Sequence, residues 1–72
     1  MSNLHVLDAT GDSVTPWNKD NQAEIDAARK VFDDFKRKNY LAYSVEKSGN
    51  SIVHNFNPEL ELIVMTPPNV GG

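Results

Sequence analysis

The sequence predicts a small α+β domain in which one helix packs on one layer of mixed β-sheet. One segment, NQAEIDAARKVFDDFKRKN, has apolar residues at helical spacing, and the segments on both sides of it alternate between apolar and polar residues. The element order is ββαβββ, or βαβββ if the first hairpin does not form. A chain of 72 residues suits one domain with one small core. We expect a single α+β domain over 1–66 and an extended C-terminal tail over 67–72.

The segment before the helix predicts a β-hairpin. In LHVLDAT, Leu4 and Val6 fall on one face of a strand. The following TGDS is a turn, because Gly11 accepts a positive φ and Asp12 readily bonds its own backbone. The returning strand, SVTPW, contains Pro16, which cannot donate to a ladder. This strand is therefore expected at the edge of the sheet.

The helix has clear start and stop signals. Asn21 is a favourable N-cap, and Glu24 stands three residues later, as in a capping box. The basic KRK closes the segment, and Asn39 suits a left-handed stop. The apolar stripe comprises Ile25, Ala28, Val31, Phe32 and Phe35. The expected i,i+4 ion pairs are Asp26–Lys30, Asp33–Arg37 and Asp34–Lys38.

Three further strands follow the helix. YLAYSVEK and SIVHNF, separated by a turn at Gly49-Asn50, predict a second hairpin. LELIVM predicts the last strand, with Leu62 and Val64 on the face that packs against the helix. Since the intervening residues of LELIVM are also apolar, we expect this strand to be covered on both faces and to be central.

Charge and composition exclude several classes of protein. The formal net charge is −3, with 10 acidic and 7 basic residues, so a general nucleic-acid binder is not expected. The absence of cysteine excludes disulfides and cysteine-ligated metals. No signal peptide is evident, and no apolar run is long enough to span a membrane. These features predict a cytoplasmic protein that does not bind membranes.

No combination of residues indicates catalysis, a metal site or a cofactor. His5 and His54 are far apart in the chain, and no nucleophile-elbow motif is present. Asp33 and its neighbour Asp34 point to different parts of a helix surface, so they cannot easily share one ion. His54 alternates with apolar residues and is expected partly in the core or at its rim. We therefore expect a non-enzymatic protein without a cofactor.

Two aromatic residues are candidate partner contacts. Trp17 precedes the approach to the helix, where it could pack onto the helix start or act as an exposed anchor for a partner. Tyr40 leaves the same two alternatives open, whereas Tyr43 is expected in the core.

The tail, MTPPNVGG, is the second candidate site. Pro67 and Pro68 end the strand and stiffen the exit in an extended form. Gly71 and Gly72 follow, and glycine lets another backbone approach closely. The tail is either an ordinary terminus or a slim peptide that enters a narrow channel or lies flat on a partner. We treat it as a candidate conjugation or docking tail.

Together, this element order and terminal diglycine resemble the ubiquitin-like β-grasp family. The resemblance implies that an activating enzyme adenylates the Gly72 carboxylate, which then passes to a thioester and finally to a lysine amine. Gly71 would keep the approach slim. The implied partners are the activating enzyme and target proteins. The alternative is a small structural or adaptor subunit of a larger assembly, such as a virus-like particle, with neighbouring subunits as partners.

Overall fold

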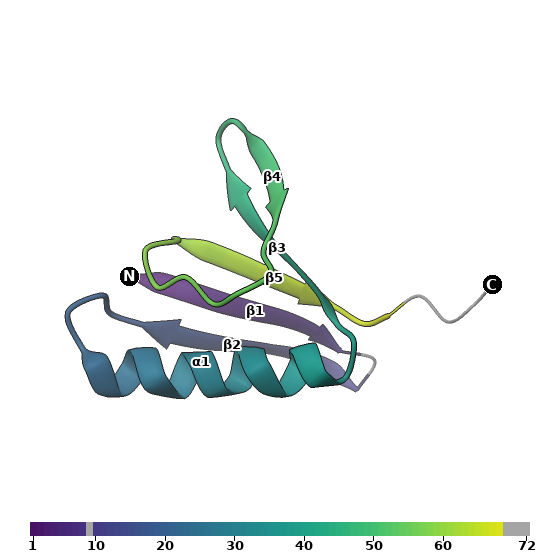
Figure 1. Ribbon diagram of the computed structural model, residues 1–72, viewed down its shortest axis with the longest axis horizontal. Coiled ribbons are helices and arrows are strands. Elements are labelled where there is room, and N and C mark those ends of the chain that lie inside the picture. The colour runs from purple at the N-terminus through teal and green to yellow at the C-terminus, as the bar shows by residue number, and fades with distance from the viewer. Residues whose placement is uncertain (9, 69–72) are drawn as a thin grey trace.

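The computed structural model of the chain describes residues 1–8 and 10–68. The elements in chain order are β1 (Ser2–Asp8), β2 (Gly11–Trp17), α1 (Gln22–Arg37), β3 (Leu41–Glu46), β4 (Gly49–Ile52) and β5 (Leu62–Thr66). The strands form one mixed sheet in the order β2-β1-β5-β3-β4, in which only β1 and β5 are parallel neighbours. The helix lies on one side of this sheet (Figure 1). The predicted α+β class and the order ββαβββ are confirmed.

The first hairpin forms as predicted. β1 and β2 pair antiparallel along their whole length. Leu4 and Val6 are fully buried on the helix side of β1. Gly11 has a φ of 132°, which favours glycine at the start of β2. Pro16 lies in β2 at the edge of the sheet, where its missing N–H does not interrupt a ladder.

The helix begins after the predicted cap, but the capping box is incomplete. The Asn21 side chain accepts a hydrogen bond of 3.2 Å from the backbone N–H of Glu24. The Glu24 carboxylate does not return this bond; it accepts from the backbone N–H of Asn18 at 2.8 Å. The Glu24 side chain therefore holds the segment before the helix, at Asn18, against the first turn of α1. Asn39 has a φ of 67° just after the helix, as predicted. No helix in the described part of the chain is long and apolar enough to cross a membrane.

The ion pairs on α1 differ from those predicted. Within the described residues, Asp26 pairs with Arg29 at 3.7 Å and Asp34 pairs with Arg37, both at i,i+3 spacing. Residues three and four apart are both neighbours on a helix surface, and the planar arginine group suits a carboxylate better than lysine does. Each aspartate therefore pairs with the arginine three residues later, although i,i+4 spacing was predicted from the order of acidic and basic residues. Each exposed pair contributes about 0.2–0.5 kcal/mol.

The second hairpin turns earlier than predicted. The register pairs Glu46 with Gly49, so the turn residues are Lys47 and Ser48. Gly49 has a φ of 126° and is the first residue of β4. β4 ends at Ile52 and is shorter than the predicted strand.

The chain turns toward the core immediately after β4. Val53 is buried, and its backbone N–H donates to the carbonyl oxygen of Ala42 at 2.9 Å. His54 is exposed, so the prediction that it lies partly in the core is wrong. The strand ends before this position, and Val53 rather than His54 takes the inward place.

The two faces of β5 are the reverse of the prediction. Ile63 and Met65 are fully buried and belong to the core on the helix side. Leu62 and Val64 lie on the opposite face, because successive residues of a strand alternate. The register with β1 decides this, since Leu4 is paired with Ile63. The predicted central position of β5 is confirmed.

Strand β3 shows the same reversal. Ala42 and Ser44 are buried, and they pair with Met65 and Ile63 of β5. Tyr43 therefore faces away from the helix and is only half-buried, so its predicted core position is wrong. Small residues suit this part of β3, because the helix and the chain after β4 pack over them.

The core contains a chain of aromatic contacts that links β2, the connection before β5, and α1. The Trp17 and Phe56 ring centroids are 5.0 Å apart, and those of Phe32 and Phe56 are 5.8 Å apart. These tilted arrangements are the favoured ones for aromatic pairs. Phe56 lies in the long connection between β4 and β5, so this connection completes the core.

Candidate functional site

Trp17 is placed in the core, which supports the packing alternative. Its side chain is 0% exposed, and its indole N–H donates to the carbonyl oxygen of Pro58 at 3.0 Å. Both the apolar body and the polar atom of the indole are therefore satisfied within the domain. A partner contact through Trp17 is wrong for the folded chain, because no surface of the side chain remains to bind.

Tyr40 lies at the other end of the helix. Its ring centroid is 4.8 Å from that of Phe35, and its backbone N–H donates to the Phe35 carbonyl oxygen at 3.1 Å. The side chain is half-buried and packs against the core cluster. Tyr40 thus closes this end of the core while keeping some accessible surface, and its role as a partner contact stays a prediction.

The C-terminal exit starts at the central strand. Thr66 is the last residue of β5 and pairs with Leu41 of β3. Pro67 is exposed and Pro68 is half-buried as the chain leaves the sheet (Figure 1). The predicted diglycine lies outside the described residues.

The sheet face opposite the helix carries a row of side chains that crosses all five strands. The pairings of the four neighbouring strand pairs place one residue of each strand in register. We call this set the open-face row; its members, from β2 to β4, are Val14, His5, Val64, Tyr43 and Ile52. It brings together residues that are far apart in the sequence.

The two ends of the open-face row are the most exposed. Val14 is 55% exposed and Ile52 is 52% exposed. Val64, at the centre, is only 9% exposed, since neighbouring strands flank it. Leu41 is 48% exposed and pairs with Thr66, so exposed apolar surface continues to the tail exit. Such surface is typical of a protein contact when its members lie together.

The described residues offer little for metal or acid–base chemistry. No group of three or more histidine, aspartate or glutamate side chains is placed to hold a metal ion within residues 1–8 and 10–68. His5 lies in β1 and His54 lies beyond β4, so neither assists the other. The open face instead presents mainly apolar side chains, and burial of their remaining exposed surface by another protein is favourable by about 25 cal/mol for each Å².

The open-face row was not predicted from the sequence. Alternation predicts the faces of each strand separately, and it predicts the wrong inward face for β3 and β5. The available signal was that LELIVM is apolar on both faces. One helix covers only one of these faces, and the apolar residues of the other face are the sequence signal for the open-face row.

Comparison of the chain with family models, with curated proteins and with solved structures finds no match. The assignment of function therefore depends on the geometry of this chain.

Proposed function

We propose that the chain is a small protein-interaction domain with a β-grasp-like fold, and that it acts as a ubiquitin-like modifier. The observation that carries the interaction role is the open-face row together with Leu41, which continues its exposed apolar surface to the tail exit. A partner that covers Ile52 and Leu41 removes apolar surface from water without any rearrangement of the domain.

The topology supports the β-grasp-like part of the proposal. Two hairpins flank a central strand, the first and last strands are parallel neighbours, and one helix covers one face. The last strand is central, so the chain leaves the domain from the middle of the sheet. The pairing of Thr66 with Leu41 brings the exit of the chain next to an exposed apolar residue, which supports a role for the exit in protein contacts.

The tail chemistry supports the modifier part. An activating enzyme would convert the Gly72 carboxylate to an acyl adenylate at the expense of ATP, with release of pyrophosphate. A thiol would then displace AMP to form a thioester, and a lysine amine would displace the thiol to form an amide. Each step needs a slim approach, and residues 71 and 72 carry no side chain. The proposal requires that Gly72 carry the free carboxylate of the mature protein.

Expression in the native host tests the proposal. The protein carries an N-terminal epitope, the lysate is denatured, and the blot compares the intact chain with a variant lacking Gly71 and Gly72. We expect heavier species that resist denaturant only with the intact chain. Mass spectrometry should identify Gly72 joined to lysine.

The control is Val70→Ala, which changes the tail but keeps the diglycine, and it should give the same heavier species. A single band at the monomer mass for both the intact and the truncated chain would contradict conjugation in that host.

An assembly subunit is the second candidate, because the same exposed apolar residues suit burial by neighbouring subunits. It predicts that the native protein elutes as a large complex and that the denatured protein gives only the monomer band, with or without Gly71 and Gly72. Size measurement of the native lysate separates this candidate from a modifier.

A further inference from the structure

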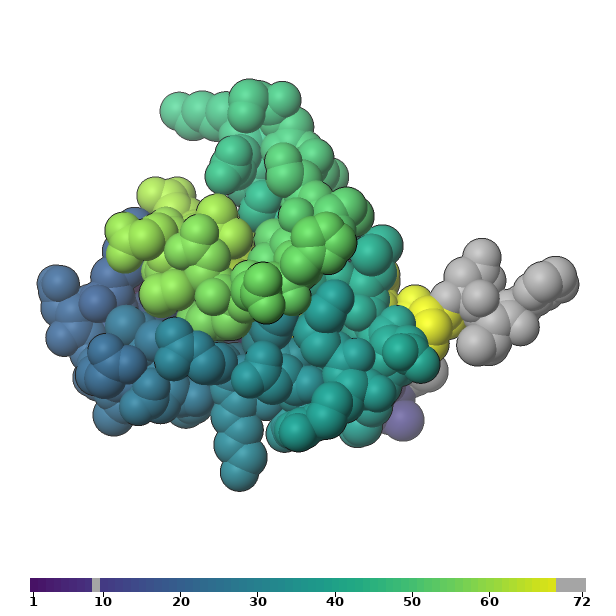
Figure 2. All heavy atoms as spheres, viewed as in Figure 1, coloured from purple at the N-terminus to yellow at the C-terminus, as the bar shows by residue number. Residues whose placement is uncertain are grey.

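Strands β3 and β5 separate at one end of the sheet and leave a crevice between them. Their pairing ends at Ser44 and Ile63, although β3 continues to Glu46. Beyond this point the β3–β4 hairpin diverges from the main body (Figure 1). The space-filling view shows a hollow between the hairpin and the segment that precedes β5 (Figure 2). We call this hollow, which has a volume of about 560 Å³, the fork crevice.

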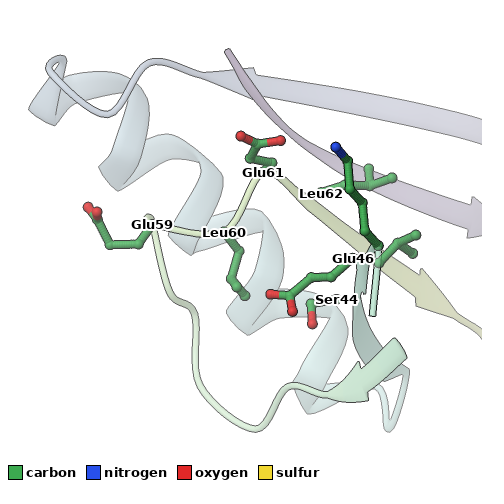
Figure 3. Close-up of a pocket in the computed structure, with 8 residues that line it drawn as sticks. Ser44, Glu46, Glu59, Leu60, Glu61 and Leu62 are labelled. Atoms are coloured by element: carbon green, nitrogen blue, oxygen red, sulfur yellow. The ribbon is translucent and has the colours of Figure 1, made fainter. Parts of the chain in front are cut away.

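The fork crevice combines negative charge with apolar walls. Three glutamates and one lysine line it, namely Glu46, Glu59, Glu61 and Lys47. Leu60 and Leu62 provide apolar surface beside these groups. The Glu46 carboxylate lies over the crevice between Leu60 and Ser44, whereas Glu59 and Glu61 extend outward at the rim (Figure 3). Negative charge over an apolar wall suits a cation that has an aliphatic stem.

Ser44 supplies a polar group at the base of the crevice. It is only 3% exposed, and no hydrogen bond of its side chain is found among the described residues. Yet no fully enclosed side-chain oxygen in the described chain lacks a partner. The Ser44 hydroxyl therefore opens into the crevice that it lines, beside the Glu46 carboxylate (Figure 3). It is an unused hydrogen-bond acceptor for a bound group.

The geometry points to a specific ligand class. We propose that the fork crevice binds a lysine or arginine side chain of a partner protein, with Glu46 as the ion-pair acceptor, Ser44 as a second acceptor and Leu60 covering the aliphatic stem. A metal ion fits less well, because the three carboxylates do not converge (Figure 3). Lys47 also lines the crevice, at the hairpin turn, but it forms no ion pair within the described residues, so it does not neutralise the Glu46 carboxylate.

The crevice also has room for the chain that carries the cation. Ser44, Glu46 and Leu60 line a second hollow that reaches Ile52. Ser44 and Glu46 lie on the helix side of β3, whereas Ile52 is paired with Tyr43 on the open face, so the crevice and the open-face row are separate surfaces. The inference rests on the proposed protein-interaction role but not on the diglycine.

Titration of the ¹⁵N-labelled 72-residue chain with blocked tripeptides tests the proposal by NMR. The probes are acetyl-Gly-Lys-Gly-amide, acetyl-Gly-Arg-Gly-amide and the uncharged acetyl-Gly-norleucine-Gly-amide. We expect at least one cationic peptide to give saturable shifts at the amides of residues 44–47 and 59–62. The norleucine peptide, which has the stem without the charge, should give none that saturate.

Matched variants distinguish binding at the crevice from non-specific attraction of a cation to an acidic protein. Glu46→Gln should weaken the cationic peptide about threefold to fivefold, since a partly exposed ion pair is modest in strength. Asp33→Asn removes the same charge from the exposed side of α1 and should leave the affinity unchanged. Ser44→Ala should weaken binding less than Glu46→Gln does. Equal losses in the Glu46 and Asp33 variants, equal binding of norleucine, or shifts spread over the acidic residues of α1 would each overturn the proposal.

A truncated chain keeps this test independent of conjugation. The variant lacking Gly71 and Gly72 should bind the cationic peptide as the intact chain does. If the intact chain binds the peptide but gives no heavier species on the blot, only the modifier proposal is contradicted. If the intact chain gives heavier species but does not bind the peptide, only the crevice proposal is contradicted.

Discussion

Strands β1 and β4 illustrate two differently built regions of the sheet. β1 has neighbours on both sides, and its Leu4 and Val6 are fully buried under the helix. β4 has one neighbour, and every one of its residues is exposed. Figure 1 shows the β3–β4 hairpin extending away from the layer that α1 covers. The helix side thus holds the fold together, while the hairpin leaves its surface exposed to solvent.

The difference follows from where the single helix can reach. The apolar stripe of α1 buries Ile25, Ala28 and Phe32 against β1, β2 and β5 and the start of β3. A helix of this length cannot also cover the end of the hairpin. Regions with few buried apolar contacts open at lower free energy than the core does. The comparison therefore predicts large effects of mutation under the helix and small or local effects in the hairpin.

The largest effect is expected at Trp17. Trp17→Ala removes a fully buried ring from its contact with Phe56 and should lower the free energy of unfolding by about 3–5 kcal/mol. A domain of this size has little stability to lose, so the variant should be partly unfolded without denaturant. Urea denaturation followed by circular dichroism measures the change.

Trp17→Phe is the matched variant. It keeps an aromatic ring near Phe56 but loses the N–H that donates to the Pro58 carbonyl, so we expect an intermediate loss of about 1–3 kcal/mol. If Trp17→Ala costs no more than a typical surface substitution, about 0.5 kcal/mol, the helix side is not the main source of stability.

A smaller and local effect is expected at Gly49. Its φ of 126° is costly for any residue with a side chain, although a methyl group there would meet no other atom. Gly49→Ala should therefore destabilise the hairpin through backbone strain, by about 1–3 kcal/mol. Hydrogen exchange should become faster at β3–β4 amides beyond Ser44 and stay unchanged in β1.

Ser51→Ala is the control, since Ser51 is exposed in the same strand without a positive φ. It should leave exchange of the hairpin amides nearly unchanged. Equal acceleration in β1 and β4 in the Gly49 variant would mean that the two regions open as one unit, and the comparison between them would fail.

Local signals were sufficient for the helix and the first hairpin. Asn21 and Asn39 mark the two ends of α1, and Pro16 correctly assigns β2 to an edge. These predictions succeed because each depends on the local chemistry of one residue: the capping side chain of Asn21, the left-handed backbone of Asn39 and the missing N–H of Pro16. The faces of β5 depend instead on its neighbours: Leu62 and Ile63 are both apolar, so alternation alone cannot say which one faces the helix. The parallel pairing of Leu4 with Ile63 decides it.

The candidate site was less accessible to prediction than the fold. Trp17 could not be assigned from sequence, because its acceptor, the Pro58 carbonyl, is distant in the chain. The open-face row needs four strand registers at once, and the fork crevice depends on where the pairing of β3 with β5 stops. Pairing between distant segments determines each of these features, and no short motif encodes it.

The smallest effect on stability is expected at Ile52, the hairpin end of the open-face row. Ile52→Thr keeps a β-branched side chain in an exposed edge position, so the free energy of unfolding should change by less than about 0.5 kcal/mol. The same change removes apolar surface that a partner would cover, and the yield of conjugates in the host should fall severalfold at equal protein level.

Val14→Thr, at the opposite end of the row, tests whether the contact spans the sheet or stays on the hairpin. A loss of stability comparable to that of Trp17→Ala would place Ile52 in the cooperative core and remove the distinction between the two regions. Unchanged stability with unchanged conjugation would instead show that partners do not use this face.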